Sequence, residues 1–97
     1  MPAFLVYVSQ TGPEWDPAKP MEQQSLWPEH AVFMNRLVDE GLIALGGPLH
    51  GQRRAFHVWE ADSDEAIRAE LAADPWSGSH LILESIIPVT LALDGRE

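Results

Sequence analysis

Apolar and polar residues are patterned along this chain in segments that predict four strands. Residues 3–9 are apolar, aromatic or β-branched at nearly every position, which is typical of a strand with two covered faces. Shorter runs of the same kind predict strands over residues 42–46, 54–60 and 81–92. Residues 10–24 are rich in proline and polar side chains, which predicts a long loop after the first strand.

Two further segments have the periodicity of amphipathic helices. Apolar residues recur at the spacing of one helical face over residues 26–40, and Gly41 is placed to end that helix. Ser63 is a good N-cap for a second helix over residues 64–73, which Pro75 would end.

The resulting order, strand-helix-strand-strand-helix-strand, predicts one α+β domain spanning residues 1–97. A chain of 97 residues can bury one hydrophobic core but not two. The order is the ferredoxin-like βαββαβ pattern, and right-handed crossovers then give a four-stranded antiparallel sheet with two helices on one face. Strands one and three lie at its centre. Gly46, Gly47 and Pro48 predict the turn that begins the 47–53 hairpin connection.

The sheet face away from the helices is also expected to be apolar. The first strand has Leu5 and Tyr7 on the side opposite its other apolar residues, and the fourth has Leu83 opposite Ile82 and Ile86. A solvated face would carry polar residues at alternate positions. We therefore expect a homodimer through the sheet face, although a scatter of exposed apolar residues would produce the same pattern.

Composition narrows the classes of function. The chain has no cysteine, which excludes disulfides, thiolate metal sites and a cysteine nucleophile. Six basic residues against fifteen acidic ones give a formal charge of −9, which repels phosphates and anionic lipid. We expect no nucleic-acid and no membrane partner. No apolar run suffices for a membrane span or a signal peptide, so we expect a cytoplasmic protein.

A histidine and an aspartate are expected to meet at one edge of the sheet. In the βαββαβ topology the first helix begins, and the second ends, at the edge where strand one ends. His30 lies in the first turn of one helix and Asp74 at the end of the other, each spaced to face inward. A carboxylate can orient a histidine that acts as a base or ligand. Alternatively, His30 is a core histidine and Asp74 caps its own Asp-Pro-Trp turn.

Other residues at this edge are candidates for substrate binding. We assign that role to Ser9, Arg54 and Trp76, because arginine pairs with carboxylates and tryptophan can wall a pocket. Solvated hairpin arginines and a packing tryptophan are the alternatives. Further candidates at the same edge are Gln10, Arg53, Ser77 and His80, whereas His50 and His57 are less promising candidates.

Metal and organic cofactors are not expected. No pair of histidines or carboxylates has the i, i+4 spacing of a helical metal site, and no phosphate-binding glycine motif is present. A three-ligand site of His30, Asp74 and His80 is a disfavoured alternative.

Several short motifs resemble the YCII-related (YciI-like) family in their order and spacing. They are residues 30–41 (HAVFMNRLVDEG), 42–48 (LIALGGP), 63–66 (SDEA) and 74–76 (DPW). The resemblance extends over about residues 25–88 and includes the opening strand.

The resemblance implies a dimeric α+β barrel and an active site that contains His30 and Asp74. Two features depart from the family pattern: the loop over residues 10–24 is long, and Trp76 stands where the family often has Phe or Tyr.

The first functional hypothesis is a small cofactor-independent enzyme. His30, oriented by Asp74, would act as general acid/base in an isomerase- or lyase-like step on a small organic molecule, either aromatic or enol-forming. The alternative is a non-catalytic module that binds a small ligand or assembles with a partner, in which the two residues merely join two helix ends. A metal-dependent enzyme is a third hypothesis.

Overall fold

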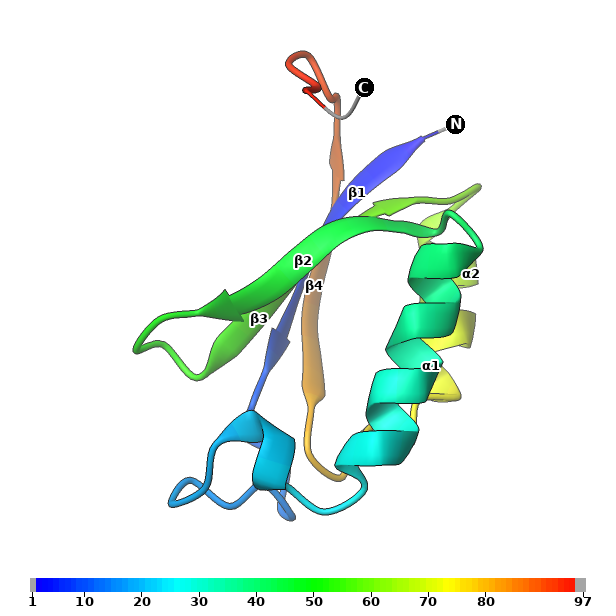
Figure 1. Ribbon diagram of the computed structural model, residues 1–97. Helices are drawn as coiled ribbons and strands as arrows, with labels where there is room; N and C mark the ends of the chain where they lie inside the picture. Colours follow the sequence, from blue (N-terminus) through cyan, green and yellow to red (C-terminus); the bar gives the residue numbers. More distant parts are fainter. Residues whose placement is uncertain (1, 96–97) are drawn as a thin grey trace.

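The computed structural model describes residues 2–95 and confirms the ferredoxin-like α+β fold (Figure 1). The elements in chain order are β1 (Ala3–Ser9), the 3₁₀ turn η1 (Met21–Gln23), α1 (Trp27–Asp39), β2 (Ile43–Leu49), β3 (Arg54–Glu60), α2 (Asp64–Ala72) and β4 (Ile82–Val89). Within the described residues, no helix has the length and apolar character needed to cross a membrane.

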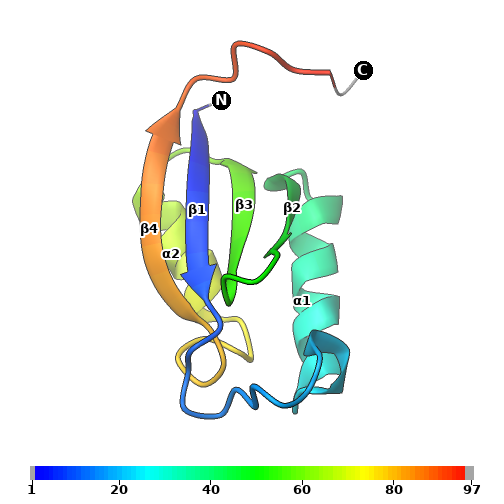
Figure 2. The same cartoon turned by 90° about the vertical axis from the view of Figure 1, so that its left-hand side faces the viewer.

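The four strands form one antiparallel sheet in the order β2-β3-β1-β4, so β1 and β3 are central as predicted. Both helices pack on one face, and Figure 2 shows the other face in front with α2 behind it. The core lies between this sheet and the helices. Its largest fully buried apolar side chains are Trp59, Leu37, Ile67 and Val6.

The turn predicted at residues 46–48 is wrong, because these residues continue β2 to Leu49. Pro48 is tolerated because β2 is an edge strand, where a missing backbone N–H disrupts little pairing. Gly46 is required by a close approach: a Cβ on it would lie 2.6 Å from the Phe56 carbonyl oxygen. The chain instead turns after Leu49, where Gly51 has a φ of +74°.

A β-bulge in β4 places Ile86 on the opposite face of the sheet from the one that the sequence pattern predicts. The register between β1 and β4 shifts after Tyr7, which leaves Glu84 without a partner in β1. Because the extra residue reverses the alternation, Ile86 packs against the same core as Leu83 instead of opposite it.

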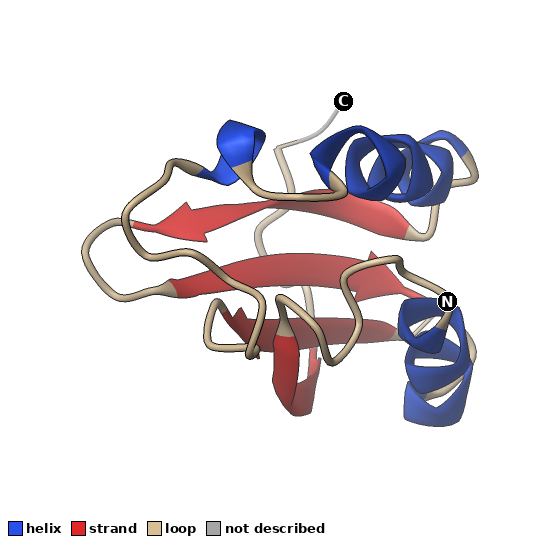
Figure 3. Ribbon diagram, turned by 90° about the horizontal axis from the view of Figure 1, so that it is seen from below, coloured by secondary structure: helices blue, strands red, loops and turns tan. Residues whose placement is uncertain are grey.

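The loop over residues 10–24 is held by one buried side chain. The amide of Gln24 accepts a hydrogen bond from the Asp16 N–H at 2.8 Å and donates to the carbonyls of Asp16 and Lys19 at 2.7 and 3.0 Å. Gly12 packs so closely on the segment after α2 that a Cβ would collide with the Ser79 carbonyl. The loop over residues 10–24 and the segment after α2 therefore lie together at the edge of the sheet where β1 ends, which faces the viewer in Figure 3.

Candidate active site

His30 and Asp74 meet where the first turn of α1 approaches the end of α2. His30 Nδ1 lies 2.8 Å from Oδ1 and 3.0 Å from Oδ2 of the Asp74 carboxylate, and both residues are buried. A carboxylate can only accept, so Nδ1 carries the proton and donates it. The hydrogen bond thereby leaves the other ring nitrogen, Nε2, as the unprotonated one in the neutral imidazole.

Asp74 also caps its own turn, so it both orients His30 and stabilises the Asp-Pro-Trp segment. Its Oδ1 accepts a hydrogen bond from the backbone N–H of Trp76 at 2.9 Å, and its carbonyl accepts one from Ser77 N–H at 2.9 Å. The backbone thus fixes the carboxylate that orients the histidine. Many active sites and metal sites position a histidine ring in this way, through a carboxylate that is itself hydrogen-bonded.

The Trp76 indole holds the His30 ring in place. It is fully buried and stacks on His30 with ring centroids 4.0 Å apart and an interplanar angle of 9°. Its Nε1–H donates to the Ser25 carbonyl at 2.8 Å. It also stacks on His80 at 5.0 Å and meets Trp15, from the long loop, edge-on at 5.5 Å. The histidine is therefore confined both by a hydrogen bond and by an aromatic surface.

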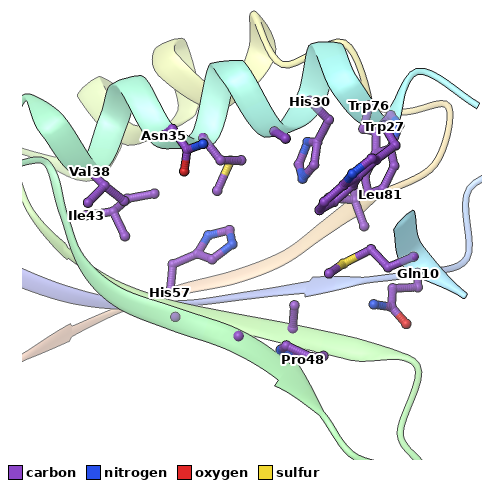
Figure 4. A pocket seen from close by; sticks show the side chains of 16 residues that line it. Gln10, Trp27, His30, Asn35, Val38, Ile43, Pro48, His57, Trp76 and Leu81 are labelled. Carbon is purple, nitrogen blue, oxygen red and sulfur yellow. The ribbon is translucent and has the colours of Figure 1, made fainter. Parts of the chain in front are cut away.

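A cavity of about 310 Å³ lies between α1 and the strands β2 and β3 (Figure 4). His30 enters it from α1, and His57 enters it from β3. The predicted apolar stripe of α1 forms much of the helical wall. Its members there are Trp27, Ala31, Met34 and Val38.

His30 presents its free nitrogen in this cavity. Nε2 has no hydrogen-bond partner among residues 2–95, while the ring lines the cavity wall. An imidazole with one nitrogen held by a carboxylate and the other open to a largely apolar space has the geometry of a general base.

His57, one of the two less promising histidines in the sequence, faces the same cavity as His30. It is 7% exposed and lines the cavity. The pKa of His57 is lowered from 6.5 to about 4, mainly by burial; a positive charge on His30 contributes in the same direction, and the Asp74 carboxylate partly offsets both effects. The alternation of β3 places His57 on the same side as the core residue Trp59, but it does not show that a cavity lies there.

Ser9 and Arg54, two of the three residues assigned to substrate binding, lie outside the cavity, whereas the further candidate Gln10 lines it. The Ser9 hydroxyl bonds to Thr11 Oγ1 at 2.7 Å and does not line the cavity. Arg54 lies on the opposite face of the sheet, where its Nε donates to Glu84 Oε1 at 2.8 Å and its guanidinium covers the Tyr7 ring at 4.6 Å. Of the three proposed substrate-binding residues, only Trp76 lines the cavity.

His80 is fully buried and uses both ring nitrogens within the protein. Nε2 lies 2.8 Å from Ser25 Oγ and Nδ1 lies 2.8 Å from Ser79 Oγ. His80 thus fastens the turn after α2 to the segment before α1. Among residues 2–95, no three His, Cys, Asp or Glu side chains are placed to hold a metal ion.

A second hollow, of about 440 Å³, adjoins the cavity and shares Gln10, Met21 and Pro48 with it. Lys19 and Arg53 line this hollow, together with polar and acidic residues that include Glu22. Neither Lys19 nor Arg53 forms an ion pair within the described part of the chain. Arg53, rather than Arg54, is therefore the hairpin arginine on the side of the cavity, and its guanidinium donates to the Gln10 carbonyl at 3.4 Å.

No protein-family model matches this chain, and a search of curated proteins finds no match.

Holding His57 neutral makes folding stability depend on pH. The unfolded chain protonates this residue near pH 6.5 and the folded protein near pH 4, so the free energy of unfolding falls as pH decreases between these values. By pH 4.5 we expect a loss of about 2–3 kcal/mol from this residue alone. Urea unfolding of wild type and His57→Gln at pH 7.5 and 4.5 measures it.

The exposed His50 supplies the matched control, because His50→Gln should retain the wild-type pH dependence. Carboxylates also titrate in this interval, so the quantity of interest is the difference between variants. Equal pH dependence in wild type and His57→Gln would contradict a neutral, buried His57.

Proposed function

We propose that this protein is a small acid–base enzyme that needs no cofactor for its proton transfers. The observation that supports the proposal is that the two ring nitrogens of His30 have different surroundings. Nδ1 donates a hydrogen bond to Asp74, and Nε2 has no partner among residues 2–95 and is open to the cavity. A merely structural histidine at a helix end has no need of an adjoining cavity.

In the proposed reaction His30 Nε2 accepts a proton from an acidic C–H or O–H group of the substrate. Asp74 stabilises the imidazolium that forms, without itself taking the proton. The imidazolium then returns the proton to another atom of the same molecule, which completes an isomerisation, or to a leaving group, which completes an elimination. A positioned base of this kind contributes roughly 10²–10⁴-fold to the rate.

The cavity limits the substrate to a small and largely apolar molecule. Its volume of about 310 Å³ is near the lower end of small-molecule sites, and most of its exposed lining is apolar. Few polar side chains line its wall, namely Gln10, His30, Asn35 and His57. An organic molecule with a single reacting polar centre suits such a space.

The resemblance to the YCII-related family supports the same proposal. That resemblance implied an active site at His30 and Asp74, the pair that is hydrogen-bonded here. We propose membership of that family on this basis, together with the βαββαβ order.

Substituting either member of the pair should reduce catalysis without unfolding the protein. We expect kcat/KM for proton transfer in unsaturated γ-lactones and 1,3-dicarbonyl compounds to fall about 10²–10⁴-fold in His30→Gln. Asp74→Asn should act in the same direction, because an amide N–H facing Nδ1 favours the tautomer that is protonated on Nε2. The exposed α2 variant Arg68→Gln serves as control and should keep full activity.

The non-catalytic alternative predicts a different result. If His30 and Asp74 only join two helix ends, His30→Gln lowers the free energy of unfolding by about 1–3 kcal/mol and leaves any turnover within tenfold of wild type. Absence of rate acceleration by the wild-type protein on the whole substrate panel would also count against the enzyme proposal.

We further propose that the open face of the sheet binds a second copy of the chain. A row of four aliphatic residues crosses all four strands on this face: Leu45, Val58, Leu5 and Ile87. Leu45 and Ile87 are 47% and 42% exposed, and Phe56 and Tyr7 form the next pair along the two central strands. A continuous apolar strip suits a two-fold interface, in which each copy covers the other.

The dimer proposal predicts a solution mass twice that of the 10.8 kDa chain. Val58→Lys should convert the protein to a folded monomer, because it places a charge in the centre of the strip. Val32→Lys, on the solvent side of α1 where Val32 is 72% exposed, should remain dimeric. Light scattering coupled to size-exclusion chromatography distinguishes these states, and a monomeric wild type would contradict the proposal.

A further inference from the structure

Two buried side-chain nitrogens have no hydrogen-bond partner among residues 2–95: Nδ1 of His57 and Nε1 of Trp59. Only His57 also lines the cavity. Its second nitrogen, Nε2, forms no hydrogen bond in the described part of the chain either. Because polar side chains that are largely buried are nearly always hydrogen-bonded in folded proteins, a histidine without any partner on the wall of a cavity points to a molecule in that cavity that binds its accessible nitrogen.

The surroundings of the ring favour one tautomer. Nδ1 is sealed from solvent and has no acceptor, so a proton there would be a buried, unpaired N–H group. Nε2 is not among the fully buried unpaired atoms, so we infer that it is the nitrogen open to a molecule in the cavity. The neutral ring therefore favours a proton on Nε2, which makes His57 a hydrogen-bond donor toward the cavity.

The two cavity histidines differ in what they can do. Asp74 fixes the proton of His30 on Nδ1, so His30 offers a lone pair to the cavity. His57 has no carboxylate partner and is held uncharged by burial, which lowers its pKa to about 4. It offers an N–H instead. The rings enter from opposite walls, His30 from α1 and His57 from β3 (Figure 4).

We propose that His57 donates a hydrogen bond from Nε2 to the carbonyl oxygen of the substrate, and that the substrates are carbonyl compounds with an acidic C–H next to that carbonyl. The inference rests on the proposed acid–base function of His30. When Nε2 of His30 removes the proton, the C–H electron pair forms a C=C bond and the C=O π pair moves onto oxygen. The resulting enolate oxygen is stabilised by the His57 N–H.

A neutral imidazole suits this role for two reasons. It stabilises a developing oxyanion by a preorganised dipole, which is effective in a water-poor space, and it does not compete with His30 for the proton. A carbonyl oxygen placed in an apolar cavity without a donor would also pay a desolvation cost, so the donor favours binding as well. His57 would then be a catalytic residue in direct contact with the reacting oxygen.

The binding of 4-nitrophenolate tests this proposal without a known substrate, because the phenolate is a stable planar oxyanion that resembles an enolate. Its visible absorbance reports binding. We expect His57→Leu to weaken binding about 10- to 100-fold through loss of one hydrogen bond to a charged oxygen. His57→Gln should rescue most of the affinity, since its amide N–H can occupy the place of Nε2–H. His57→Leu replaces an unpaired nitrogen by apolar atoms and should stay folded by urea unfolding.

The outcomes separate the two proposals. Loss of phenolate binding in His57→Leu with rescue in His57→Gln supports the donor role, whatever the turnover of the wild type. Unchanged binding and unchanged kcat/KM in His57→Leu overturn the donor role, even when His30→Gln is inactive. Equal loss of binding in His57→Leu and His57→Gln also overturns it, because the effect would then be one of cavity shape.

Discussion

The hydrogen bond from His30 Nδ1 to the Asp74 carboxylate is the interaction on which the site depends. It joins the first turn of α1 to the turn that follows α2, two ends that the βαββαβ topology brings to one edge of the sheet. Trp76 reinforces it twice, because its backbone N–H binds the same carboxylate and its ring stacks on His30. One carboxylate thus fixes a turn, a ring orientation and a tautomer, so these properties are coupled and change together.

The cavity depends on what the surrounding elements leave unfilled. Part of the apolar stripe of α1 forms the cavity wall, while Leu37 on the same helix is fully buried in the core. On β2, Gly46 gives the His57 ring its room, since a Cβ there would lie 3.1 Å from Cδ2 of that ring. Gly46 and Gly47, which resemble a turn in the sequence, therefore lie in a strand, and the absence of a side chain at Gly46 lets β3 and the His57 ring pack closely against it. A charged dyad and an uncharged imidazole then share one small space, and their different surroundings give them different chemistry.

The element order and the meeting of His30 with Asp74 could be predicted from sequence, because periodicity, caps and chain topology are encoded locally. The facing of Ile86 could not, since one extra residue in a bulge reverses the alternation of a strand. Arg54 was proposed for substrate binding at the correct edge of the sheet, but the alternation of β3 places its side chain with Tyr7 and Glu84 on the face opposite the cavity. His57 was missed because side-chain alternation shows which face a residue occupies, but not whether a helix closes that face or leaves a cavity there.

The most direct test of the account is a long-range ¹H–¹⁵N correlation spectrum of the histidine rings in wild-type protein at pH 7.5, with His30 and His57 assigned by substitution. Each ring reports which nitrogen carries its proton. The account predicts that His30 is protonated on Nδ1 with Nε2 unprotonated, and that His57 is neutral with its proton on Nε2. A His30 ring protonated on Nε2 alone would contradict the central claim, because the nitrogen that faces the cavity would then have no lone pair with which to accept a proton.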